Sequence, residues 1–169
     1  VYPNSGVKTG FHTASHHMEE EKKILDWAKM NAYHVSLIPY FLEKLKKTPD
    51  GPKLVSVVCA VDCGLAVNPN IIAMQMESGI GYGLSAALTG AVTLKEGRVE
   101  QGNFDDYPVL RINEMPAVET HIVPSKNKTT GVGEPGTPVI APALANALAQ
   151  IDGKPTRSLP LAGQGVKLA

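Results

Sequence analysis

The sequence predicts an α+β fold in which helices pack on a mixed sheet. Strand-like apolar segments at 54–62 and 118–123 are interspersed with two segments of helical periodicity, 71–89 and 139–151. Hydrophobic residues make up 43% of the 169 residues and charged residues 19%, which are ordinary values for a globular protein. A chain of this length is expected to form one domain with its own core.

The first 53 residues are predicted to contain a lead-in, a helix and a strand. Residues 1–17 are polar and lack periodicity, and the pattern becomes helical over 18–32. If that helix began earlier, His12 and His16 would share a face with Glu19 or Glu20, a spacing that can bind zinc. No helix start signal precedes Met18, so the sequence favours a solvated lead-in over a metal site.

Two strands joined by a tight turn are predicted over residues 33–46 and 54–62. The turn lies at Thr48–Pro52, where proline, aspartate and glycine come together. Aromatic and β-branched residues favour a strand over 33–46, and Pro39 would cost a helix interior about 3 kcal/mol. A helix over 33–46 stays open as the alternative; in a strand, Pro39 requires an edge or a bulge.

Residues 71–89 are predicted to form a helix with small residues on one side. Asn68 is suited to cap this helix, and Pro69 is suited to its first turn. Gly79 and Gly83 are four residues apart, so they share a face and permit close packing. A phosphate-binding loop is disfavoured because these glycines lie inside the helical pattern rather than between a strand and a helix.

The remaining elements are a β-hairpin over 91–100, the strand over 118–123 and the helix over 139–151, which Gly153 ends. His121 on the strand is expected to be packed or hydrogen-bonded rather than a ligand. The folded domain is expected over 54–162, with a flexible tail at 163–169.

Composition argues against several classes of partner and site. Sixteen basic and sixteen acidic side chains give a formal net charge of zero, so nothing indicates binding to nucleic acid or an anionic membrane. The apolar runs are too short or too interrupted by glycine to span a bilayer. Cys59 and Cys63 lie about 13 Å apart along a predicted strand, too far for a disulfide, so buried thiols are expected.

The loop Gly131–Pro138 is the most informative segment. It holds Glu134 between glycines, and an alanine-rich helix pattern follows directly. Glycines let a backbone approach a ligand closely, and a carboxylate fixed at a helix N-terminus is a candidate general base. Pro138 and Pro142 are tolerated near a helix start. The alternative is a turn that merely contains a glutamate.

Five motifs follow one another in a fixed order. They are the strand and turn Val57–Pro69 with Asp-Cys-Gly, then Asn103–Arg111, Glu114–Glu119, Gly131–Leu148 and Leu159-Pro160. Together they resemble the molybdopterin-binding large subunit of the xanthine dehydrogenase and aldehyde oxidoreductase family, over about 54–161. The resemblance implies a C-terminal portion of a molybdopterin-binding domain, whose missing upstream segments supply most contacts to the cofactor.

The resemblance implies roles for three residues. Glu134 matches the family's general base beside molybdenum, in the oxidative hydroxylation of N-heterocycles or aldehydes. Gln75 matches a glutamine whose amide touches an equatorial ligand of molybdenum. Gly133 matches a position near the cofactor, where its backbone N–H can face a ligand. The alternatives are a solvent-facing Gln75 and a Gly133 required only by the turn.

Structural roles are expected for three aspartates. Asp62 ends a strand before a glycine, where it would accept backbone hydrogen bonds in the turn. By the resemblance, Asp105 and Asp106 belong to a structural loop.

The resemblance also implies cofactors and partners. These are molybdenum–molybdopterin in its cytosine dinucleotide form, and a partner subunit that carries the iron–sulfur clusters, in a bacterial cytoplasm or periplasm. The alternative function is a non-catalytic folded fragment that binds no cofactor. Such a fragment would self-associate, for instance as a homodimer, through apolar surfaces that the missing segments would cover.

Overall fold

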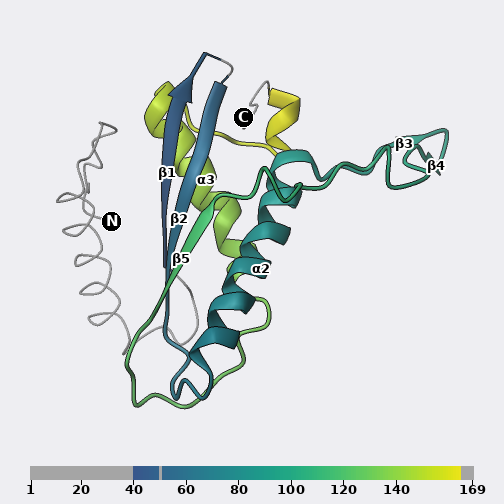
Figure 1. Cartoon of the computed structure of the whole chain (residues 1–169). Coiled ribbons are helices and arrows are strands. Elements are labelled where there is room, and N and C mark those ends of the chain that lie inside the picture. Colours follow the sequence, from purple (N-terminus) through teal and green to yellow (C-terminus); the bar gives the residue numbers. More distant parts are fainter. Residues whose placement is uncertain (1–39, 50, 165–169) are drawn as a thin grey trace.

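The computed structural model describes residues 40–49 and 51–164 (Figure 1). The helix expected over 18–32, the histidines of the zinc alternative and Pro39 lie outside the described residues. The described elements are β1 (Tyr40–Thr48), β2 (Gly51–Val61), α2 (Pro69–Thr89), β3 (Leu94–Lys95), β4 (Arg98–Val99), β5 (Ala117–Ile122), α3 (Gly136–Asp152) and the 3₁₀ turn η1 (Leu161–Gln164).

A three-stranded sheet of order β1-β2-β5 forms one layer of the fold. β1 and β2 are antiparallel and joined by the predicted tight turn, in which Gly51 has a φ of 126°. β5 runs parallel to β2, so the sheet is mixed, as predicted. The described part of the ambiguous segment, from Tyr40 onward, is a strand and not the alternative helix.

Both long helices pack on one face of this sheet and enclose the core (Figure 1). Val57, Cys59 and Val61 alternate along β2, so they point to the same face, and all three are fully buried. The helical side chains of this core recur every three or four residues, as a buried helix face requires. They are Ile72, Met76, Ile80, Leu84 and Leu88 of α2, with Ile140, Leu144 and Leu148 of α3.

The predicted start of α2 and the predicted end of α3 are confirmed, but α3 begins earlier than predicted. Asn68 caps α2 as predicted, since its Oδ1 accepts a hydrogen bond from the backbone N–H of Ile71 at 3.2 Å. α3 ends at Gly153, whose φ of 68° is a left-handed conformation that suits glycine. However, α3 begins at Gly136 rather than near Val139, so Pro142 lies inside the helix and not at its start.

The last described residues form the helical turn η1, which extends into the segment predicted as a tail. Leu161, at the start of η1, is fully buried in the core. This side chain fixes the turn against the body of the protein, so the folded part of the chain includes η1.

Between α2 and β5 the chain makes a long excursion, residues 91–110, which we call the arm (Figure 1). It carries the predicted hairpin, with β3 paired to β4 around Glu96 and Gly97. Both turn residues have positive φ, 50° and 77°, as a two-residue hairpin turn requires. The strand–helix–strand unit β2–α2–β5 is therefore interrupted by a projection on its return path. None of the described helices is long and apolar enough to cross a membrane.

Candidate functional site

The loop that carries Glu134 is held at both ends. At one end the backbone N–H of Thr130 donates a hydrogen bond to the carbonyl of Cys63 at 3.1 Å, just beyond β2. At the other end Gly136 begins α3 against the backbone of α2. The five residues 131–135 span the gap between these two anchors. A short loop fixed in this way can hold a side chain in one place, as a catalytic group requires.

Asp62 secures the first anchor. Its Oδ1 accepts a hydrogen bond from the backbone N–H of Gly64 at 3.0 Å, and its Oδ2 accepts one from Asn127 Nδ2 at 2.8 Å. Gly64 has a φ of 74°, and a Cβ there would lie 2.6 Å from the Asn127 carbonyl oxygen. The predicted structural role of Asp62 is thus confirmed, and it extends to fixing the loop that precedes Thr130.

The second anchor is a close contact between two helix backbones. A Cβ on Gly136 would lie 3.1 Å from the carbonyl oxygen of Met76. Across the same contact, a Cβ on Gly83 would lie 2.3 Å from Ile140 Cγ2 and 2.4 Å from the Thr137 carbonyl oxygen. The predicted close packing along the glycine face of α2 is confirmed, and its partner is the first turn of α3.

Gln75 and Glu134 flank the same end of this helix contact. Gln75 directly precedes Met76, whose carbonyl faces Gly136, and Glu134 lies two residues before Gly136. Gln75 is also one turn before Gly79 on the same helix face, a rise of about 6 Å. Both residues therefore belong to the N-terminal end of the α2–α3 contact, and both have exposed side chains.

No contact within residues 40–49 and 51–164 explains the glycines before Glu134. A Cβ added at Gly131 or Gly133 would meet nothing within 4 Å. Neither residue has the positive φ that favours glycine. The alternative in which Gly133 is required only by the turn therefore has no support from its backbone. Open space over two nearby glycines is what a group lying against the backbone would need.

The two cysteines are buried and free, as predicted. Burial raises the pKa of the Cys59 thiol to about 12. The pKa of Cys63 is also raised, by burial and then by the Asp62 carboxylate, against a smaller opposing effect of a backbone hydrogen bond. Both thiols are therefore neutral at physiological pH and unsuited to act as nucleophiles. Within residues 40–49 and 51–164, no three His, Cys, Asp or Glu side chains cluster as metal ligands.

Two further titratable residues outside the loop are His121 on β5 and Asp106 on the arm. His121 Nε2 lies 2.9 Å from Glu119 Oε1 on the same strand, but this atom is buried and makes no hydrogen bond within the described residues, so His121 is packed rather than hydrogen-bonded. On the arm, Asp106 accepts backbone hydrogen bonds from Gly102 at 2.7 Å and Asn103 at 3.0 Å, which lower the pKa of its carboxyl group. The loop role predicted for Asp106 is confirmed.

Two residues that position the site carried little signal in the sequence. Gly136 is one of several glycines in its motif, and only the fold brings it against Met76. Asn127 lies in a polar loop, and its partner Asp62 is 65 residues away. A glycine next to a predicted helix start, facing a second helix with its own glycine row, is the pattern that would have identified Gly136.

Comparison with known proteins identifies relatives. Residues 51–116 match the family model of the molybdopterin cofactor-binding domain. The beta subunit of isoquinoline 1-oxidoreductase from Brevundimonas diminuta is 43% identical over 105 residues, which cover 62% of this chain and 13% of that protein. A subunit of nicotinate dehydrogenase from Pseudomonas putida is 30% identical over 114 residues, which cover 67% of this chain and 10% of that protein. The chain thus spans only a small part of the relatives it matches.

Solved structures share the fold. The Cu,Mo-CO dehydrogenase, in a carbon monoxide reduced state, superposes with a TM-score of 0.58 at 23% identity, over 66% of this chain and 15% of that one. Quinoline 2-oxidoreductase from Pseudomonas putida 86 gives a TM-score of 0.51 at 21% identity, over the same shares. At these identities the likeness concerns the fold alone. The family resemblance predicted from the motifs is confirmed: this chain is a relative of the molybdopterin-binding subunits of the xanthine dehydrogenase and aldehyde oxidoreductase family.

Proposed function

We propose that this chain forms the C-terminal wall of a molybdenum hydroxylase site, with Glu134 as its general base. The observation that carries the proposal is the joint placement of Gln75 and Glu134 at one end of the α2–α3 contact. The family match and the relatives support a molybdopterin-binding fragment. The base, the substrate and the assembly are the parts that experiment must test.

The residues present fit such a cofactor. Gly131 and Gly133 are exposed and leave space at the Cβ position within the described residues, so a ligand could approach their backbone closely. The Gln75 amide can donate and accept hydrogen bonds, which suits oxygen ligands of a metal. When bound, the molybdenum cofactor supplies the two-electron redox chemistry of a hydroxylation. Glu134 would accept the proton on a carboxylate oxygen, while Gln75 and the loop backbone orient the group.

The finer assignments follow from the family and are part of the proposal. The cofactor is the cytosine dinucleotide form, and the substrate is an N-heterocycle or an aldehyde. Electrons leave through a separate iron–sulfur subunit. Isoquinoline 1-oxidoreductase and nicotinate dehydrogenase are relatives whose names point to N-heterocycles, which favours that class of substrate.

The alternative function is a self-associating fragment without cofactor. It is favoured by the large apolar side chains that this chain leaves exposed, such as Leu65, Val67 and Phe104. Elemental analysis combined with native mass on the purified chain separates the two. Molybdenum with a bound pterin supports the proposal. A metal-free dimer would favour the alternative and leave Glu134 outside any complete site.

The role of Glu134 is tested in the assembled enzyme by the Glu134→Gln variant. We expect the turnover rate to fall by about 10²-fold or more, because an amide cannot accept the proton. Molybdenum and pterin content should stay unchanged, because the Glu134 side chain is exposed and its carboxylate makes no contact with the described residues. Glu77 on α2 is also an exposed carboxylate, so Glu77→Gln serves as the control. Wild-type turnover in Glu134→Gln would remove the catalytic assignment.

A further inference from the structure

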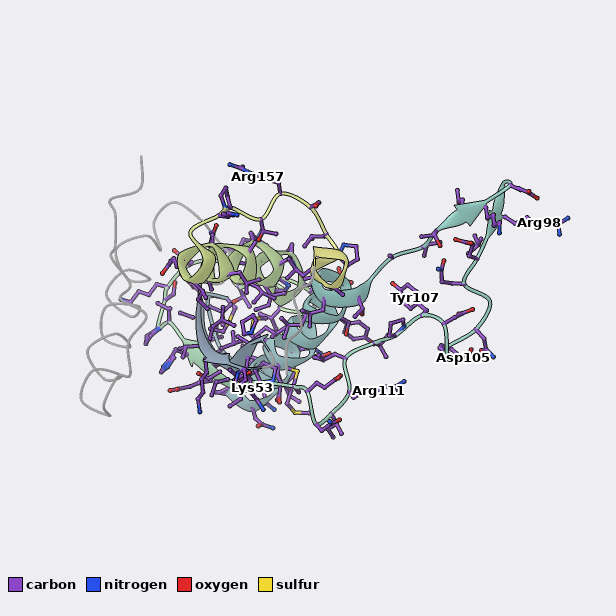
Figure 2. All side chains as sticks on the ribbon, turned by 90° about the horizontal axis from the view of Figure 1, so that it is seen from above. Lys53, Arg98, Asp105, Tyr107, Arg111 and Arg157 are labelled. Carbon is purple, nitrogen blue, oxygen red and sulfur yellow. The ribbon has the colours of Figure 1, made fainter. Side chains whose placement is uncertain are left out.

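The arm projects away from the sheet and from both long helices (Figures 1 and 2). Figure 2 shows Arg98 and Asp105 far out along it, with Tyr107 closer to the body. No described helix or strand covers its tip in either view. The arm therefore reaches into space that the described part of this chain does not fill.

Large apolar side chains line the arm without cover. Phe104 is 89% exposed and Leu94 is 69% exposed, and Leu94 pairs with Val99 across the hairpin. Val92 and Val109 are exposed as well. Single exposed apolar residues are common on protein surfaces, but a series of them along one narrow projection marks an interaction site. A two-stranded hairpin also gains little stability by itself in water.

Side-chain hydrogen bonds fix the shape of the arm. Near the tip, the backbone N–H of Thr93 donates to Gln101 Oε1 at 2.8 Å, and Thr93 Oγ1 lies 2.7 Å from Glu100 Oε2. Beyond the hairpin, Asp106 closes a turn by accepting two backbone hydrogen bonds. The arm is therefore pre-organised, which lowers the entropic cost of docking it against a partner.

The arm is also tied to α2 at its base. Thr89 Oγ1 donates a hydrogen bond to the carbonyl of Pro108 at 2.8 Å. Ser85 Oγ accepts one from the backbone N–H of Leu110 at 3.0 Å. Because these bonds lie on the last turns of α2, the direction of the arm is set by the same helix that carries Gln75.

We propose that the arm docks on the upstream molybdopterin-binding segments of the same subunit. The inference rests on the proposed function, which makes this chain one part of a larger subunit. The whole arm lies inside residues 51–116, the segment that matches the family domain, so it is a feature of that domain. The matched region is 13% of the isoquinoline relative, so most of such a subunit is available as the partner.

The charge on the arm defines the partner surface further. Acidic groups outnumber basic ones along residues 91–110, so the partner surface should be apolar and bordered by basic side chains. Two arms from two copies of this chain would repel each other weakly, which disfavours arm-to-arm pairing. The acidic residues are Glu96, Glu100, Asp105 and Asp106, and the basic ones are Lys95 and Arg98.

Thiol labelling tests the inference. This chain would replace the matching region of the isoquinoline relative's large subunit, with Phe104→Cys as the reporter and Leu159→Cys as an exposed apolar control. Both native thiols of this chain are buried, and the raised pKa of Cys59 keeps it neutral, so neither should compete for a maleimide. The modified site is read by mass spectrometry of the peptide that contains position 104, which separates it from thiols elsewhere in the chimera. We expect labelling at position 104 to slow by about tenfold or more on assembly, relative to the isolated chain.

The outcomes separate this inference from the proposed function. A chimera that binds molybdopterin yet labels freely at position 104 would overturn the docking role and leave the function standing. Protection without cofactor would support docking and count against the function. Protection in a dimer of the isolated chain would identify a second copy as the partner and overturn the proposal.

A variant of the isolated chain gives an independent check. The double substitution Leu94→Ser and Phe104→Ser should leave the midpoint of thermal unfolding nearly unchanged, because both side chains are mostly exposed and neither belongs to the core. A clear drop in the midpoint would show that the arm is packed within this chain, and would overturn the inference even if the chimera fails to assemble.

Discussion

Two groups of glycines near the Glu134 loop have opposite surroundings. In the α2–α3 contact, a Cβ on Gly83 would meet Ile140 at 2.3 Å, so the chain itself leaves no room. In the loop before Glu134, a Cβ on Gly131 or Gly133 would meet no atom of the described residues within 4 Å. The first group is explained by packing within the chain. The second has no such explanation within the described residues, and the proposed site at this loop accounts for it by a bound cofactor.

Gly83→Ala should have the largest effect on stability. The new methyl group would overlap Ile140 and the Thr137 carbonyl, and helix backbone cannot yield as a flexible side chain can. We expect a loss of about 2 kcal/mol or more in the free energy of unfolding, beyond the gain in helix propensity. Urea unfolding followed by circular dichroism measures it. An unchanged midpoint would mean that α3 does not pack on the glycine face of α2.

Gly81→Ala is the matched variant in the same helix, with the opposite expected sign. A Cβ at Gly81 would meet only the Met115 side chain, at ordinary distances of 3.5 and 3.6 Å. Helix propensity then dominates, and the free energy of unfolding should rise by about 0.5–1 kcal/mol. The same urea titration checks it. Destabilisation as large as that of Gly83→Ala would show that α2 tolerates neither substitution. The space around each glycine would then not explain the effect of replacing it.

Gly79→Ala should fall between these two variants. Its Cβ would meet Gly136 Cα and Thr137 at 3.3 Å, slightly closer than ordinary contact. The small strain opposes the gain in helix propensity, so the net change should stay within about 1 kcal/mol of zero. A variant that unfolds as readily as Gly83→Ala would indicate that the first turn of α3 is more tightly seated on α2 than these distances imply.

How much the sequence could predict depends on the range of the interactions. The turn after β1, the Asn68 cap and the glycine face of α2 were predictable because each depends on neighbouring residues. The start of α3 was predicted three residues too late, because the prolines on either side of Gly136 are typical of a loop in the sequence. In the fold, α3 begins at Gly136, where it contacts Met76 of α2. The direction of the arm was not predictable, because it is set by hydrogen bonds that join Ser85 and Thr89 to Leu110 and Pro108, 25 and 19 residues further along the chain.

In the candidate site, too, some features were predictable from the sequence and others depended on the fold. Glu134, Gln75 and Gly133 were selected by their place in motifs, and nothing local distinguishes them from surface residues of the same types. Their common position depends on Gly136, where two helices meet. The sequence could therefore identify the residues by resemblance, while the geometry that relates Gln75 to Glu134 required the fold.

Gly133→Ala should have the smallest effect on stability and the most informative effect on function. An alanine at this position meets no atom and needs no unusual backbone, so the free energy of unfolding should change by less than about 0.5 kcal/mol. If Gly133 adjoins the cofactor in the assembled enzyme, as proposed, the methyl group would obstruct the cofactor, and molybdenum and pterin content should fall. Gly81→Ala, in the same assembly, should retain full cofactor content because its methyl group faces Met115. Unchanged cofactor content in Gly133→Ala would mean that the open space beside Glu134 is filled by protein or water, and the loop would then be a surface turn.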